Sequence, residues 1–257
     1  MTALRLACAA LMLILAGCTT LVRAPAAAES VHEPRESWAR VLARFVDDQG
    51  RVDFTALAAD RADLDVYVAW VYRVSPTTHP AQFPDKDTVL AYHLNAYNAL
   101  AMYSVIEAGV PQTLAGLRKI PFFFLRQIQV GGQVMSLSNY EKQVIIPLGD
   151  VRVHFALNCM SVGCPRLPRQ PFLATNLDAQ LNREAQAFFA DSNHLQVDGA
   201  RKIVNVSEIL KFYREDFLKA EPTLTDFINR YHAPAIPQSW QVNFIPYDWT
   251  INHQPRP

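Results

Sequence analysis

Hydrophobic residues recur at helical spacing along most of the chain. In residues 36–46, the side chains of Trp38, Val41, Leu42 and Phe45 fall on one face of a helix. The same spacing predicts further helices at residues 62–74, 88–108, 173–190 and 224–231, and one that starts at Ser207. The helix over 88–108 stops at Gly109 and Pro111, because both residue types end helices.

Shorter segments with alternating or β-rich composition predict strands between these helices. They lie at residues 51–54, 122–125, 127–130, 133–135, 151–157, 195–199 and 202–206, with a closing strand within 242–249. Gly131-Gly132 and Asp198-Gly199 predict hairpin turns. Helices and strands in mixed order favour the α+β class. We expect a single domain in which helices pack on a small, mostly antiparallel sheet.

The N-terminus has the pattern of a secretory signal. Arg5 precedes an apolar run over residues 6–15, which is too short to cross a bilayer. Leu15-Ala16-Gly17-Cys18 resembles the lipobox of bacterial lipoproteins, and the resemblance implies cleavage before Cys18 and its acylation, for example with palmitate. Thr19 after the cysteine then favours the outer membrane, facing the periplasm. The alternative is an ordinary signal with a chance cysteine.

These features divide the chain into a signal peptide (1–17), a tether rich in Ala, Pro and Glu (18–35) and one domain (36–257). Half of all residues are hydrophobic, so a substantial core is expected. Lysine plus arginine balances aspartate plus glutamate at 24 each, which gives no indication of a nucleic-acid partner. No phosphate-binding glycine loop or Gly-x-Ser-x-Gly motif is present, and no cofactor is expected.

Three segments resemble one known family, the domain of unknown function 547. They are Asn95-Ala-Tyr-Asn98, the stretch from His154 through Cys159 and Cys164 to Pro165, and Tyr247-Asp248-Trp249. Residues 136–141 and 212–217 support the resemblance, which runs from about residue 50 to 252. Some members of that family look distantly like papain-like thiol enzymes, so the resemblance implies a papain-like core. One departure is Lys142, where the family usually has histidine.

A thiol nucleophile requires a nearby base or cation that keeps it as thiolate. Cys159 follows His154 by five residues, so a tight loop could bring the two side chains together. Glu141 is the first candidate to orient the imidazole. Asn95 and Asn98 share a helix face and are candidates for a pocket wall or an oxyanion site. We expect Ser161, Tyr247 and Asp248 to be binding residues.

Structural roles compete with each of these assignments. Cys159 and Cys164 could form a disulfide, or bind zinc with His154, although a fourth ligand is missing and no metal is expected. Glu141 fits a helix capping box with Ser138. Asn95 and Asn98 could be a hydrogen-bond hub, His154 a satisfied buried histidine, and residues 247–249 a packed latch.

Two functional classes remain open from the sequence. The first is a thiol-dependent hydrolase or acyl transferase that acts on an envelope peptide or amide. The second is a non-catalytic lipoprotein of the bacterial cell envelope that binds a ligand or protein partner. A redox role of the cysteine pair is a weaker third hypothesis, because four residues separate the cysteines instead of the usual two.

Overall fold

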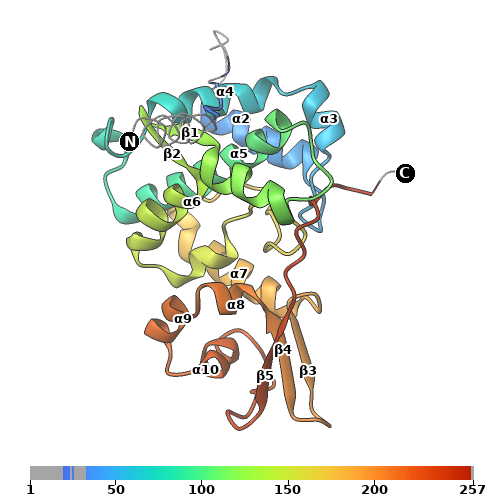
Figure 1. Ribbon diagram of the computed structural model, residues 1–257. Helices are drawn as coiled ribbons and strands as arrows, with labels where there is room; N and C mark the ends of the chain where they lie inside the picture. Colours follow the sequence, from blue (N-terminus) through green and yellow to red (C-terminus); the bar gives the residue numbers. More distant parts are fainter. Residues whose placement is uncertain (1–19, 24, 26–32, 256–257) are drawn as a thin grey trace, which may run out of the picture.

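In the computed structural model, which describes residues 20–23, 25 and 33–255, helices build the larger part of the molecule (Figure 1). The predicted signal peptide, Cys18 and most of the predicted tether lie outside these residues. The N-terminal helices are α2 (Pro34–Phe45), α3 (Phe54–Ala59), α4 (Ala62–Arg73) and α5 (Lys86–Glu107), with a short 3-10 turn η1 (Pro80–Gln82) before α5. The helices predicted over 36–46, 62–74 and 88–108 are confirmed.

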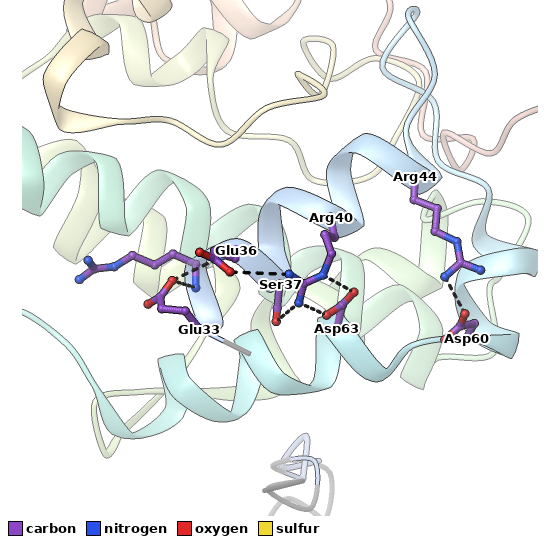
Figure 2. Close-up of polar contacts among 8 residues, drawn as sticks. Glu33, Glu36, Ser37, Arg40, Arg44, Asp60 and Asp63 are labelled. Carbon is purple, nitrogen blue, oxygen red and sulfur yellow. Dashed lines mark hydrogen bonds and ion pairs between the residues drawn. The ribbon is translucent and has the colours of Figure 1, made fainter. Parts of the chain in front are cut away.

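Helix α5 is the central element of this part. Every residue from Leu90 to Val105 is buried, so the helix is enclosed on all sides. Helices α2 and α4 pack beside it and are joined at their edge by a forked ion pair, in which Arg40 of α2 donates to both carboxylate oxygens of Asp63 (Figure 2). This rigid layer supports the residues of α5 that face the rest of the molecule.

The first sheet is a hairpin of β1 (Gln127–Val130) and β2 (Gln133–Ser136), with the predicted turn at Gly131-Gly132. Residues 20–22 of the predicted tether lie against β1, since the N–H of Val22 donates to Gln127 O at 2.8 Å. The chain before this hairpin contains a 3-10 turn, η2 (Gly116–Arg118), and a π-helix, η3 (Pro121–Leu125).

The C-terminal part begins with η7 (Ala174–Asn176) and α7 (Leu177–Ala190). Its sheet has β4 (Ile203–Ser207) at the centre, antiparallel to β3 (Leu195–Asp198) and parallel to β5 (Gln241–Ile245). Three short helices follow β4 along the chain: α8 (Ile209–Phe212), α9 (Arg214–Ala220) and α10 (Leu224–Asn229). The α+β class is confirmed, although the strands form two small sheets and one pair is parallel.

Three predicted strands are wrong. Residues 122–125 belong to the π-helix η3, residues 151–157 contain the 3-10 helix η6 (Val151–Phe155), and at residues 51–54 a bridge at Val52 leads directly into α3. In η6 the alternating side chains do not face two sides of a sheet. Instead Val153 joins the core around α5, whereas Phe155 enters a second, aromatic core.

The predicted capping box at Ser138 is also wrong. Ser136 caps α6 (Leu137–Asn139) by accepting the N–H of Asn139 at 3.1 Å. The chain then continues as a π-helix, η4 (Tyr140–Ile145), and a 3-10 turn, η5 (Ile146–Leu148). The carboxylate of Glu141 is therefore available for other contacts.

Two hydrophobic cores meet at the segment that carries the cysteines. The larger core surrounds α5, and the smaller one gathers phenylalanines of α7, α9 and α10 around Phe155. Because Leu157 and Met160 return to the larger core, residues 153–160 pass between the two cores. Within the described residues, no helix is long and apolar enough to cross a membrane.

Candidate functional site

The loop that contains both cysteines is held by two amide side chains. Asn98 of α5 donates to Ala156 O at 3.0 Å and accepts the N–H of Asn158 at 2.7 Å. Asn158 in turn donates to Pro165 O at 2.6 Å and accepts the N–H of Met160 at 2.7 Å. Each amide uses both its donor and its acceptor on backbone, so Asn98 fixes the start of the loop to the central helix and Asn158 ties the end of the loop to its start.

Asn95 lies one helical turn earlier and forms a separate hub. Its oxygen accepts from Trp38 Nε1 and from the N–H of Phe172, and its nitrogen donates to Ala91 O and Phe172 O. These bonds saturate the amide. Asn95 and Asn98 thus have the structural roles described as alternatives above, and neither lines the cavity described below.

The C-terminal segment clamps the same loop from the other side. The N–H groups of Val162 and Gly163 donate to Thr250 O and Asp248 O, both at 2.8 Å, and the N–H of Asn252 donates to Met160 O at 2.9 Å. A Cβ on Gly163 would lie 2.8 Å from Asp248 N, so only glycine permits this approach. The Asp248 side chain is exposed and accepts the N–H of Thr250.

This clamp brings Tyr247 onto the two sulfur atoms. Both cysteines are free thiols, and the Tyr247 hydroxyl oxygen lies 3.0 Å from Cys159 Sγ and 2.9 Å from Cys164 Sγ. The backbone N–H of Cys159 donates to Cys164 Sγ at 2.9 Å, and Ser161 Oγ lies 3.5 Å from Cys159 Sγ. The predicted site residues Ser161 and Tyr247 therefore both contact the Cys159 thiol.

These contacts shift the pKa values of the two thiols in opposite directions. Burial disfavours the charged form of Cys159, but hydrogen bonds with Cys164, Tyr247 and Ser161 outweigh it and lower its pKa to about 7. Burial raises the pKa of Cys164 well above its ordinary value, and the neighbouring Cys159 raises it further. Of the two thiols, Cys159 is therefore the one that loses its proton first, while Cys164 stays protonated near neutral pH.

A cavity of about 310 Å³ opens beside these sulfurs. Its wall is largely apolar and includes Phe123, Phe124, Phe212 and Trp249. Two lysines, Lys119 and Lys142, also lie on it. Lys119 Nζ lies 4.0 Å from the centre of the Trp249 ring. The candidate residues that share this wall are Cys159, Cys164, His154, Glu141 and Tyr247.

His154 reaches the cavity from η6. Its Nε2 lies 3.1 Å from Asp216 Oδ2 of α9, and its ring stacks on Tyr213 with 4.0 Å between ring centres. Burial lowers the imidazole pKa to about 4, although Asp216 opposes this, so the ring is neutral at pH 7. If Nε2 carries the proton toward Asp216, Nδ1 is the basic nitrogen, and no described residue hydrogen-bonds to it. His154 and Cys159 thus share a cavity, but no hydrogen bond joins them among the described residues.

Glu141 lies on the cavity wall between two tyrosines. Tyr213 and Tyr97 both donate their hydroxyl groups to its carboxylate, the latter at 3.1 Å. Burial raises the pKa of Glu141, and these hydrogen bonds oppose the rise. Because Tyr213 also stacks on His154, Glu141 is coupled to the imidazole through that ring instead of by direct contact. The adjacent Lys142 is exposed.

Three residues of the site, Asp216, Tyr213 and Tyr97, were not predicted from the sequence. Asp216 and Tyr213 belong to residues 212–217, which supported only the family resemblance. Their pairing with His154 and Glu141 spans sixty or more residues, which local spacing does not reveal. Among the described residues, no group of three or more His, Cys, Asp or Glu side chains is placed to hold a metal ion.

Comparison with known proteins gives one match. Residues 81–189 match the family model described as "Protein of unknown function, DUF547". The match includes α5, the cysteine loop and most of α7, and so confirms the resemblance noted from the motifs. No curated protein and no solved structure matches the chain.

Proposed function

We propose that this chain, whose residues 81–189 match the DUF547 family model, is a thiol-dependent hydrolase or acyl transferase with Cys159 as nucleophile. The observation that carries the proposal is the Cys159 thiol itself. Its pKa falls to about 7 beside an aromatic cavity large enough for part of a small acyl compound. Thiolate, and not thiol, is the reactive form of cysteine.

In the proposed reaction, the Cys159 sulfur adds to the carbonyl carbon of an ester, thioester or amide. The proton of the thiol passes to Nδ1 of neutral His154, which then gives it to the departing alcohol, thiol or amine. Water or a second acceptor cleaves the resulting thioester and restores the thiol. Asp216 positions the imidazole, and Glu141 acts one step further away, through Tyr213.

This assignment requires His154 and the sulfur to approach each other when substrate binds. Catalytic hydrogen bonds are often long in free enzymes and tighten in the substrate complex. The substrate class that suits the cavity is an acyl compound with an apolar portion, because aromatic and aliphatic side chains together form most of the wall. We propose that this acyl compound is a peptide or amide of the cell envelope.

Alkylation by iodoacetamide between pH 5 and pH 9 tests the proposal. We expect the rate at Cys159 to reach half its maximum near pH 7, with the site identified by peptide mass spectrometry and Cys159→Ala as the blank. Turnover of p-nitrophenyl and thioester substrates should be lost in Cys159→Ala and retained in Asn193→Ala, a surface control. A half-maximum near the ordinary thiol value of about 8.5 would contradict an activated nucleophile.

A non-catalytic binding role is the second candidate. It is favoured by one observation, that the imidazole is hydrogen-bonded to Asp216 while both sulfurs are engaged by Tyr247. In that case a Cys159→Ala strain keeps the wild-type function. Asn98→Ala, which releases the loop from α5, should then lose it while the protein stays folded.

We also propose that the protein is acylated at Cys18 and anchored in the bacterial cell envelope, on the outer membrane facing the periplasm. The support is the lipobox-like segment at residues 15–18. Cells labelled with an alkyne analogue of palmitate should label the wild-type protein but not Cys18→Ala. Fractionation of the two membranes then tests the location.

A further inference from the structure

The chain after α5, up to Tyr140, has exposed apolar side chains and no negatively charged residue. Residues 108–140 contain no aspartate or glutamate, whereas Arg118, Lys119 and Arg126 are cations. Leu117 is 91% exposed, Ile120 56% and Phe124 46%. We call these three residues the apolar rim. Exposed apolar residues are usually scattered singly, so three on contacting elements indicate a binding surface.

The position of Thr20 indicates what this surface binds. Thr20 O accepts the N–H of Gln127 at 2.9 Å, and Gln127 follows the end of η3 at Leu125 by two residues. Only Thr19 separates Cys18 from Thr20, and two residues span at most about 7 Å. A lipid on Cys18, which is part of the proposed function, would therefore enter the membrane close to the apolar rim.

We propose that the apolar rim, together with Arg118 and Lys119, docks the domain onto the surface of an anionic phospholipid bilayer. Apolar side chains at such a surface insert into the boundary between headgroups and acyl chains, while adjacent cations are attracted to anionic headgroups. Residues 108–140 contribute no carboxylate that an anionic surface would repel, although Glu208 lies close enough to Lys119 to interact with it. The rim thus adds a second attachment to the proposed acyl anchor.

Docking in this way places the candidate site at the membrane surface. Phe124 of the rim and Lys119 also line the cavity beside Cys159. The mouth of the cavity then lies at the bilayer boundary, where an acyl compound with an apolar portion accumulates. The residues chosen for the test, Leu117 and Ile120, lie outside the cavity wall, so docking and thiol chemistry can be measured separately.

The test is co-sedimentation of the non-acylated chain with lipid vesicles. A chain that starts at residue 18 with Cys18→Ser contains the whole fold, because both cores lie between Val22 and Ile251. It is mixed with vesicles of phosphatidylcholine alone or with added phosphatidylglycerol. Leu117→Ser/Ile120→Ser removes two rim residues, and the matched control Leu173→Ser/Val197→Ser removes two apolar residues that are 53% and 40% exposed elsewhere.

We expect the Cys18→Ser chain and the control to bind the anionic vesicles, and less so at high salt. The rim variant should bind about tenfold more weakly or worse, as expected when two aliphatic side chains no longer leave water. Equal binding by rim variant and control, or no binding by the Cys18→Ser chain, would overturn the proposal. The alkylation profile of Cys159, measured on the same proteins, tests the proposed enzyme independently, and incorporation of the palmitate analogue tests the anchor.

Discussion

Nε2 of His154 lies 3.1 Å from the carboxylate of Asp216, which reaches it from a helix sixty-two residues later in the chain. A carboxylate in this position fixes the imidazole tautomer and stabilises the imidazolium when it forms. The other oxygen of the same carboxylate, Oδ1, lies 3.0 Å from Lys219 Nζ. Asp216 therefore has two separable contacts, one with the His154 imidazole and one with Lys219 on the surface of α9.

We therefore predict that Asp216→Asn lowers kcat of the proposed reaction while Lys219→Gln does not. His154→Gln should lower kcat by about 100-fold or more, the usual size of general acid–base catalysis. Asp216→Asn should act in the same direction and leave the alkylation profile of Cys159 unchanged. Wild-type kcat in Asp216→Asn would remove Asp216 from the mechanism.

The hydroxyl of Tyr247 makes a second test, because it touches both sulfurs. Tyr247→Phe removes one of the hydrogen bonds that lower the pKa of Cys159, so that pKa should rise. Thiolate absorbance at 240 nm as a function of pH measures it directly. Tyr92→Phe, whose hydroxyl donates to Val74 O away from the cavity, is the control. A fall in the Cys159 pKa of Tyr247→Phe would contradict this account of the thiol.

Much of the fold could be predicted because its long helices have regular apolar spacing and clear ends. Both hairpins also followed from Gly-containing turns. One of the three wrong strands lies where an apolar segment contacts two cores at once. Val151 to Leu157 alternates like a strand, yet Phe155 enters the aromatic core while Val153 and Leu157 stay in the other, and a 3-10 helix achieves that division. Alternation alone does not distinguish the two.

The candidate site was predictable mainly in the segments that carry the family resemblance. The cysteine loop and residues 247–249 were identified, and the structure brings Cys159, Ser161 and Tyr247 together. The partners of His154 and Glu141 come from α9 and α5 and depend on how the two cores pack. Glu141 was open to a capping role because Ser138 precedes it by three residues, but the cap two residues earlier, Ser136, leaves the carboxylate to the two tyrosines.

The close approach of Gly163 to the C-terminal segment predicts a large effect of a single methyl group. In Gly163→Ala the new Cβ would meet Asp248 N at 2.8 Å, so the clamp must shift. We expect a loss of about 1–3 kcal/mol in the free energy of unfolding, measured with urea. Gly199→Ala is the matched control, since its Cβ would meet only Trp240, at 3.5 Å. Equal stability of the two variants would show that the C-terminal segment can shift away from residue 163 at no cost in free energy.

The cysteine pair predicts a defined response to oxidation. With oxidised glutathione, the Cys159 thiolate displaces one glutathione thiolate and forms a mixed disulfide, and the Cys164 sulfur then displaces the second. The product is a Cys159–Cys164 disulfide that blocks the proposed nucleophile, seen by mass spectrometry as a loss of two hydrogens. Cys164→Ser should stop at the mixed disulfide. If wild-type protein stops there as well, the pair has no redox role.

Two of the buried histidines, His93 and His154, predict that the protein loses stability in mild acid. Burial lowers the pKa of both His93 and His154 to about 4, whereas unfolded histidine titrates near 6.5. Between these values the unfolded chain binds more protons than the folded one. The stabilisation is therefore complete above pH 6.5 and declines as the pH falls to 4, by up to roughly 3 kcal/mol for each histidine.

Urea unfolding at several pH values measures this decline. The variants His93→Gln and His154→Gln should each reduce the decline, whereas the exposed control His79→Gln should leave it unchanged. An unfolding free energy that stays constant from pH 7 to pH 4 in the wild-type protein would show that these imidazoles are not held neutral by burial.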